Sequence, residues 1–314
     1  MDELKTYFND IVENDDSKMT SIFRWQQGME LVFDEGGAKK KFRKSCNTKK
    51  LDDKFRVNEY GNVERAVLDI LDEYGYLNKF NLIRLLNSTL EQKDRMEDYS
   101  KVIDKLCVFG AINRYKFVGH EKNNVPHVYT LSAGALSKME HSHVVKIVRM
   151  VVPPAEDAKK VIETLAFNQF HIAFMENYRN VLERYYLSYA LHNNNQRWII
   201  DGIYRLRTEK TSSKHMDICV LCLRSHNDWM NKMKKTFELI EKADVIDSPI
   251  VLILCEHTMF IKKAERYRQS LKQKDISTFY LVDVSCQNDA PLEQLLSIKS
   301  TNEFANLERV KIIL

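Results

Sequence analysis

The chain is poor in glycine, with nine glycines among 314 residues. Neither the phosphate-loop pattern G-x-x-x-x-G-K-[ST] nor the Rossmann glycine fingerprint occurs in it. Because both loops depend on glycines that let the backbone approach a phosphate, the sequence offers no familiar nucleotide-binding loop. We therefore expect no cofactor.

Long apolar runs are also absent. No stretch approaches the roughly 20 consecutive apolar residues that a membrane-spanning helix needs. Residues 1–5, MDELK, lack the basic start and apolar core of a secretory signal. We expect no membrane partner and a cytoplasmic location.

The six cysteines are scattered along the chain. Cys219 and Cys222 have the spacing of half a zinc site, but they lie in an apolar run typical of a strand. Residues three apart on a strand point to opposite faces, and no second pair completes a ligand set. We expect buried, reduced cysteines and no metal site.

The net charge of +4 is only weakly basic, so the distribution of charge matters more than the sum. Residues 38–56 form a basic arm in which Asp52 and Asp53 are the only acids. Its nine basic residues are Lys39, Lys40, Lys41, Arg43, Lys44, Lys49, Lys50, Lys54 and Arg56. The arm has few apolar residues to bury, so it is expected either to become ordered when it binds an anionic partner or to be a solvated linker.

Residues 59–140 have the pattern of a winged helix-turn-helix. Asn62 is a potential cap for a first helix that ends at Gly75, and Asn78 can cap a second. A third apolar stripe from Met96 to Leu106 ends at Phe109-Gly110. Residues 111–118 alternate with period two, and residues 125–131 look like the returning strand.

A winged helix usually places its third helix in the major groove and its hairpin on the DNA backbone. We therefore expect base-reading residues on the third helix and its approach: Gln92, Lys93, Arg95, Ser100, Lys101 and Lys105. Hairpin contacts would come from Arg114, Lys116, His120 and Lys122, and arm contacts from Lys39, Lys40, Lys41, Arg43 and Lys44. Asp98 and Asp104 flank the third helix and weaken a purely electrostatic role. The alternative is a small helical domain that binds protein.

The remaining segments are expected to be an N-terminal extension (1–58), a helical connector (141–195) and an α/β domain (196–314). Residues 21–25 and 29–33 suggest two short strands or a peripheral helix. The connector is expected to hold a long helix through Tyr178 and a second helix over 180–191. The α/β domain should contain a hairpin (198–204 and 216–224), helices over 226–243 and 258–271, buried parallel strands over 249–255 and 276–284, and a short helix in the tail.

That α/β pattern is typical of restriction-endonuclease-like domains, which hold a metal with acids on two neighbouring strands. Asp201 stands where the first acid belongs. The next strand has only Asp217, at its start, and Cys219 occupies the place of the lysine. We therefore expect no enzyme activity, and expect Asp201 to hold a turn or to make a structural hydrogen bond. Glu256 and Asp283 end parallel strands, where open α/β sheets bind ligands, although acids there are also ordinary turn residues.

Several motifs resemble the replication-relaxation family of mobile genetic elements in Gram-positive bacteria. They are VLDILDEYGYL (67–77), LIRLL (82–86), VIDKL (102–106) before Gly110, TLAFNQF (164–170) and IDGI (200–203). The resemblance covers residues 62–284. It implies an α+β or α/β chain with an N-terminal winged helix and a C-terminal endonuclease-like domain, in proteins tied to plasmid replication, transfer or their control.

Together these patterns predict a sequence-specific protein that binds double-stranded DNA of a plasmid or mobile element. It would assist replication, conjugation or transcriptional control. The C-terminal domain would form a homodimer or bind replication or transfer proteins. The alternatives are a metal-dependent nuclease or nickase that uses Asp201, and an interaction adaptor without DNA affinity.

Overall fold

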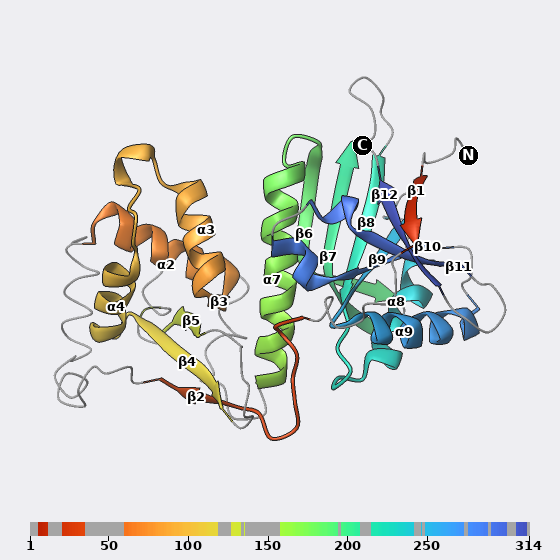
Figure 1. Ribbon diagram of the computed structural model, residues 1–314, viewed down its shortest axis with the longest axis horizontal. Helices are drawn as coiled ribbons and strands as arrows, with labels where there is room; N and C mark the ends of the chain where they lie inside the picture. Colours follow the sequence, from red (N-terminus) through yellow and green to blue (C-terminus); the bar gives the residue numbers. More distant parts are fainter. Residues whose placement is uncertain are drawn as a thin grey trace. The chain divides into compact units, whose positions relative to one another are not determined.

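The structure is a computed structural model of mixed α/β content (Figure 1). It describes residues 6–11, 21–34, 60–118, 127–132, 135, 158–193, 196–207, 215–241, 246, 249–272, 276–287, 290–299 and 306–312. The chain divides into two compact units: unit 1 is Met1–Arg24 with Gln169–Leu314, and unit 2 is Trp25–Asn168. Unit 2 is thus inserted into the sequence of unit 1, whereas the sequence suggested four successive segments.

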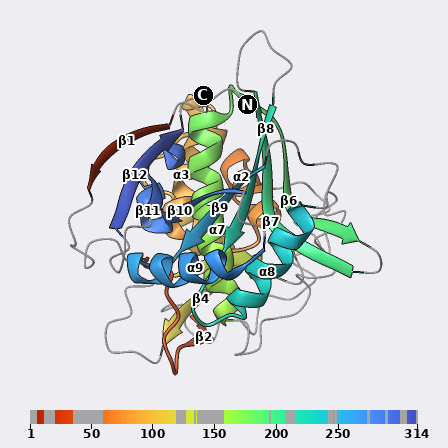
Figure 2. The same ribbon diagram turned by 90° about the vertical axis from the view of Figure 1, so that its right-hand side faces the viewer.

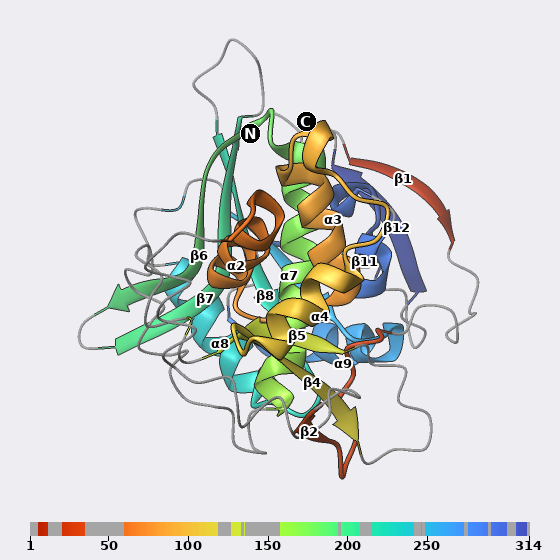
Figure 3. The same cartoon turned by 90° about the vertical axis from the view of Figure 1, so that its left-hand side faces the viewer.

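Unit 2 contains three helices followed by a hairpin, in the order expected from the sequence (Figure 3). The helices are α2 (Asn62–Tyr74), α3 (Lys79–Thr89) and α4 (Ser100–Val108). The hairpin strands are β4 (Ile112–Val118) and β5 (Val128–Leu131). With β2 (Glu30–Phe33) and β3 (Leu77–Asn78) they form a four-stranded sheet in the order β2-β4-β5-β3. Of the two short strands expected near the N-terminus, the one over 29–33 is present, and 21–25 is irregular.

Local turn chemistry explains the helix ends of unit 2. Gly75 and Gly110 follow α2 and α4 with φ of 75° and 71°, a region that glycine tolerates. The Asn78 side chain caps α3 by accepting a hydrogen bond from the Asn81 amide at 2.7 Å, as expected. The cap expected at Asn62 is wrong by one residue, because Glu64 accepts from the Gly61 amide instead.

Unit 1 is built on an eight-stranded sheet in the order β1-β12-β11-β10-β9-β8-β7-β6. Strands β8 (His215–Cys222), β9 (Ile250–Cys255) and β10 (Ser277–Val282) are parallel and buried. The other pairs are antiparallel. They involve β6 (Leu182–Asn193), β7 (Gln196–Arg207), β11 (Leu295–Lys299), β12 (Asn306–Ile312) and β1 (Thr6–Ile11).

Helices cover both faces of this sheet (Figure 2). Tyr204 on β7 packs against Phe174 of α7 (Ala158–Tyr178), with ring centroids 4.5 Å apart. The neighbouring residue Ile203 lies in the apolar core formed with α8 (Trp229–Ile240) and α9 (Thr258–Ser270). Since adjacent strand residues point to opposite faces, α7 lies on one face and α8 and α9 on the other. None of the helices in the described part of the chain combines the length and apolar character needed to cross a membrane.

Two sequence expectations for this unit are wrong. Residues 180–191 were expected to be helical, but 182–191 belong to strand β6. The connector of 141–195 is therefore not all helical, and its end cuts the β6–β7 hairpin. Tyrosines at 185, 186 and 189 favour a strand once β7 is available for pairing. The tail from Ala290 was expected to be a short helix with irregular ends; a short 3-10 helix (Pro291–Glu293) is present, but strands β11 and β12 follow it. Leu295, Leu296 and Val310 bury their side chains there.

Candidate functional sites

The expected base-reading residues do not all lie on a helix. Gln92 and Lys93 belong to a 3-10 turn (Gln92–Asp94), and Arg95 follows that turn. Helix α4 begins only at Ser100, after the buried side chain of Tyr99. The third helix is therefore shorter than the stripe from Met96 suggested, and it carries Ser100, Lys101 and Lys105.

Several of these polar groups already have partners within unit 2. Lys93 pairs with Glu91 at 2.7 Å, and Arg95 donates from Nε to the Leu90 carbonyl at 3.1 Å. Lys105 pairs with Glu64, which also caps α2. By contrast, Gln92 and Lys101 are exposed and make no hydrogen bond or ion pair with the residues that the structure describes. Of the cations on α4, Lys101 is thus the one available to a ligand.

Lys79 is a functional candidate that the sequence reasoning missed. It is the first residue of α3, and its Nζ donates to Ser100 Oγ at 2.6 Å. The amide of Ser100 donates to the Asp98 carboxylate at 2.8 Å. The Ser100 hydrogen bonds, with Lys79 and Lys101 nearby, hold the pKa of the exposed Asp98 below its ordinary value. The start of α4 is therefore a mixed surface with two cations and one acid. The Asn78 cap could have revealed Lys79, because it fixes that residue in the first turn.

Arg114 has a structural role that the sequence did not indicate. Its guanidinium lies 2.9 Å from Asp34, which follows β2, and 3.1 Å from Asp104 on α4. Asp34 also lies 3.0 Å from His127 Nε2. Arg114 therefore connects β4 with β2 and α4 and is only 20% exposed, whereas Lys116 on the same strand is exposed.

The remaining expected DNA contacts lie outside the described residues. They are His120, Lys122, Lys39, Lys40, Lys41, Arg43 and Lys44. Between Tyr60 and Val118 the chain has nine acidic and nine basic residues. The segment that spans α2 to β4 is thus electrically balanced, and the basic excess of this region of the sequence belongs to the arm.

Asp201, the candidate nuclease acid, accepts structural hydrogen bonds. Its Oδ2 lies 2.8 Å from the Cys222 amide and 2.8 Å from Lys232 Nζ. Lys232 comes from α8 and also donates to the Cys222 carbonyl at 2.9 Å. Asp217, the other acid of this hairpin, is buried and paired with Arg205. The sequence reasoning found the acid but not Lys232, because the lysine is on a helix and not on the neighbouring strand.

No zinc-like arrangement forms in the described residues. Cys219 and Cys222 are buried free thiols, as expected, and Cys219 packs in the core beneath α8. Within the described part of the chain, no group of three or more His, Cys, Asp or Glu side chains is placed to hold a metal.

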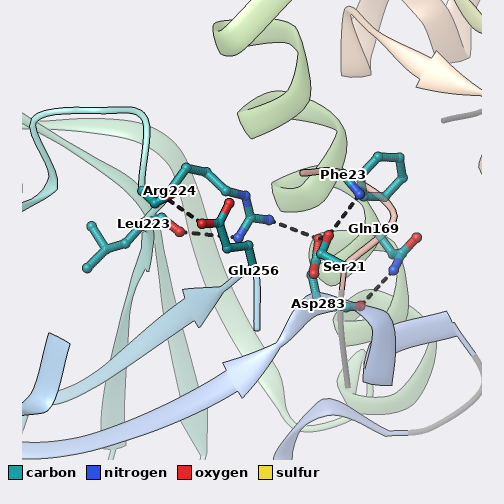
Figure 4. A network of polar contacts seen from close by, with 8 residues as sticks. Ser21, Phe23, Gln169, Leu223, Arg224, Glu256 and Asp283 are labelled. Carbon is teal, nitrogen blue, oxygen red and sulfur yellow. Dashed lines mark hydrogen bonds and ion pairs between the residues drawn. The ribbon is translucent and has the colours of Figure 1, made fainter. Parts of the chain in front are cut away.

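A buried polar cluster lies at the carboxyl ends of the parallel strands (Figure 4). Arg224, Glu256 and Asp283 follow β8, β9 and β10, and all three are 0% exposed. Arg224 Nη2 pairs with Asp283 Oδ2 at 2.9 Å, and Nη1 donates to the Leu223 carbonyl. Ser21 donates from Oγ to Asp283 at 2.7 Å and from its amide to the Glu256 carbonyl at 2.7 Å.

The cluster has two buried carboxyl groups and one guanidinium, which pairs with Asp283, while Glu256 Oε1 accepts from the Ser225 amide at 3.3 Å. Burial raises the pKa of Asp283, against the opposing effects of Arg224 and Ser21. Burial alone would lower the pKa of Arg224, but the acidic groups around it, including Asp283 and Glu256, raise it above its ordinary value. His257 Nδ1 accepts from the Phe260 amide at 3.1 Å, and its Nε2 lies 3.7 Å from Glu256 Oε1.

Comparisons with known proteins assign no family. No protein-family profile matches the chain, and no curated protein matches it. A crystal structure of protein VC1899 from Vibrio cholerae is a distant neighbour, with 10% identity and a TM-score of 0.27. That alignment covers 83% of this chain and 56% of the other.

Proposed function

We propose that this chain is a DNA-binding protein whose unit 2 acts as a winged helix on duplex DNA. The order α2-β3-α3-α4-β4-β5 is that of a winged helix, with α4 in the place of the recognition helix. The observation that carries the proposal is at the start of α4. Lys101 is exposed there without a partner among the described residues, beside Lys79. A helix N-terminus with two lysines suits contacts to phosphate and to base edges.

The biological context of the proposal comes from the sequence. The resemblance to the replication-relaxation family favours an accessory role in replication, transfer or transcriptional control of a plasmid or related element. Because helix-turn-helix proteins often bind palindromic sites as dimers, we include a homodimer in the proposal. Catalysis is not part of it, since the acids of the β7–β8 hairpin are separately paired with Lys232 and Arg205.

The test is fluorescence anisotropy of the full chain on DNA fragments from around its own gene, with random duplex as competitor and a salt titration. We expect selective binding at physiological salt. Lys101→Ala should weaken specific binding by about 1–3 kcal/mol and relax specificity at one base position if Lys101 contacts a base. A uniform loss on all sequences would make it a phosphate contact.

The matched control is Lys160→Ala, which removes the same charge from an exposed position on α7 within unit 2. It should leave binding unchanged. If Lys101→Ala and Lys160→Ala have the same DNA affinity, α4 does not dock on DNA. If the wild-type chain binds every fragment equally and loses all binding with salt, only a non-specific basic arm remains and the proposal fails.

A protein-interaction adaptor is the second candidate, and a specific observation favours it. Phe80 on α3 and Met96 before α4 are 51% and 41% exposed. Exposed aromatic and methionine side chains are enriched in surfaces that bind protein. This candidate predicts no DNA affinity even at low salt.

A further inference from the structure

The carboxyl edge of β8, β9 and β10 combines features that folding stability does not require. Three adjacent parallel strands are each followed by a charged residue with 0% exposure: Arg224, Glu256 and Asp283. Removing charged groups from water costs several kcal/mol per ion by general estimates, and replacing such clusters by apolar residues is often neutral or stabilising. A cluster of this kind at the ligand-binding edge of an α/β sheet is a candidate functional site.

The hydrogen bonding of the cluster is incomplete. Glu256 Oε2 and Asp283 Oδ1 are buried and have no hydrogen-bond partner among the described residues. On the donor side, the same holds for Arg224 Nε. Native proteins rarely leave such atoms unsatisfied, so each one calls for an explanation. Two of the acceptors without a partner are carboxylate oxygens, which are suited to a cationic donor, and a third is the amide oxygen of Gln169.

The charged groups of the cluster also favour a cationic ligand. Asp283 and Glu256 are two carboxyl groups beside one guanidinium, and His257 Nε2 lies 3.7 Å from Glu256 Oε1. In Figure 4 the side chains of Arg224 and Asp283 point toward one another, with Glu256 beside the guanidinium. With both carboxyl groups ionised the cluster has room for a further positive charge, and on the Asp283 side the described residues supply only Arg224.

The segment Ser21–Phe23 covers this cluster from the N-terminal part of unit 1. The Ser21 hydroxyl donates to Asp283 Oδ2 and accepts from the Phe23 amide at 2.9 Å, while the Ser21 amide donates to the Glu256 carbonyl. Ser21 is 5% exposed and Phe23 is fully buried. The Ser21 hydroxyl therefore supplies one hydrogen bond to Asp283 but brings no charge.

We propose that the carboxyl edge of β8–β10 is a binding site for a small primary amine, whose ammonium group takes the place of the Ser21 hydroxyl on Asp283. An ammonium supplies three N–H donors and the missing positive charge. Asp283 Oδ1, on the carboxylate that Ser21 contacts, still lacks a donor among the described residues. Residues 21–24 lead directly into unit 2, so displacing Ser21 would alter the chain segment at the start of that unit. The proposal does not depend on DNA binding by unit 2.

The experiment is isothermal titration calorimetry of the full chain without DNA. The probes are ethanolamine and putrescine, compared with tetramethylammonium, which has charge without N–H donors, and ethylene glycol, which has donors without charge. We expect binding of the two amines and none of the two comparison compounds. Equal binding of tetramethylammonium, or no binding of either amine, would overturn the proposal.

Ser21→Ala keeps the buried charges and removes the competing hydroxyl. It should bind the amines about tenfold more tightly, which corresponds to about 1.4 kcal/mol. The control Ser270→Ala removes a hydroxyl that bonds within α9 and should bind like the wild type. Asp283→Asn should abolish binding, but Ser21→Ala is the decisive variant because it spares the buried ion pair. Unchanged or weaker affinity of Ser21→Ala would contradict displacement of Ser21.

Hydrogen exchange gives an independent readout of the same step. The amides of Ser21 and Phe23 are both bonded in this structure, so they should exchange slowly. Saturating putrescine should accelerate exchange at these two amides and leave the β9 amides unchanged. Binding with full retention of their protection would show that the amine sits elsewhere and would overturn the assignment.

Discussion

Lys232 on α8 and Asp201 on β7 form an ion pair, and both also bind the backbone of Cys222 on β8. Lys232 thus connects α8 with β7 and β8. The two side chains are 16% and 21% exposed, so solvent screens their attraction only in part. This arrangement gives Asp201 a structural role that can be measured separately from any catalytic role.

Lys232→Met should lower the free energy of unfolding by about 1–3 kcal/mol, because the Asp201 carboxylate and the Cys222 carbonyl each lose a charged donor. Asp201→Asn should have a cost of the same order. Urea denaturation of both single variants and the double variant measures their coupling. Since the two residues share one interaction, the double variant should lose less stability than the two single losses together. Full additivity would contradict the structural role.

The Asp201→Asn variant also tests the alternative that the chain is a metal-dependent nuclease. Wild type and Asp201→Asn are incubated with supercoiled plasmid in magnesium or manganese. The structural role predicts no cleavage by either protein. Cleavage by the wild type that disappears in a folded Asp201→Asn protein would make Asp201 a catalytic acid. It would contradict a purely structural role for this residue.

Asn168 near the middle of α7 supports the end of α2 inside unit 2. Its Nδ2 donates to the carbonyls of Tyr74 and Tyr76, at 3.0 and 2.8 Å, on either side of Gly75. Asn168→Ala should reduce stability by about 1–3 kcal/mol, because two carbonyls lose their donor away from bulk water. Asn177→Ala is the control, since its exposed side chain bonds only within its own helix, and it should cost less than about 0.5 kcal/mol. Thermal unfolding of the two variants measures both losses of stability. Equal losses of stability for Asn168→Ala and Asn177→Ala would show that Asn168 does not support the end of α2.

His171 on α7 makes the stability of unit 1 dependent on pH. Burial lowers the pKa of His171 from 6.5 to about 4. Its Nδ1 lies 2.8 Å from the Tyr204 hydroxyl. The unfolded chain therefore takes up a proton at higher pH than the folded chain. The contribution of the neutral ring is complete above pH 6.5 and is lost as pH falls toward 4, by about 3 kcal/mol in total.

His171→Gln removes this titration and keeps a polar side chain next to Tyr204. The difference in unfolding free energy between wild type and His171→Gln should shift against the wild type between pH 6.5 and 4. Urea titrations at several pH values measure it. Asn177→Ala, a non-titrating and exposed position on the same helix, is the control and should retain the wild-type slope. A constant difference across this range would show that His171 does not titrate as its burial implies.

The sequence predicted those parts of the fold whose signals are local. Gly75, Asn78 and Gly110 set helix ends through their own conformation or the nearest backbone amide, so the helices and hairpin of unit 2 could be placed. Strand β6 could not, because its tyrosines fit a helix or a strand until β7 pairs with it. The pairing of β1 with β12 joins opposite ends of the chain and leaves no local pattern.

The residues of the candidate sites could likewise be predicted only where their signal is local in the sequence. Glu256 and Asp283 were recognised because a strand end is visible in the sequence. Their partners Ser21 and Arg224 were missed, because Ser21 lies 262 residues before Asp283. Lys105 and Arg114 were expected to contact DNA, and their pairing with Glu64 and Asp34 depends on tertiary contacts that periodicity does not reveal.

The charge of Asp104 provides the sharpest test of how α4 is used. Its side chain is 61% exposed on α4 and lies 3.1 Å from Arg114. If α4 enters the major groove, this carboxylate faces a dense array of phosphates, so Asp104→Asn should tighten binding to random duplex several-fold at low salt. Stability should change by about 0–1 kcal/mol, because the pair with Arg114 is partly exposed and Arg114 keeps Asp34. Asp69→Asn on the exposed side of α2 is the charge-matched control and should have a smaller effect. If the two variants tighten binding equally, the gain comes from net charge alone and not from docking of α4. If Asp104→Asn weakens binding, the α4 carboxylate takes part in the contact, and the orientation proposed for this helix is wrong.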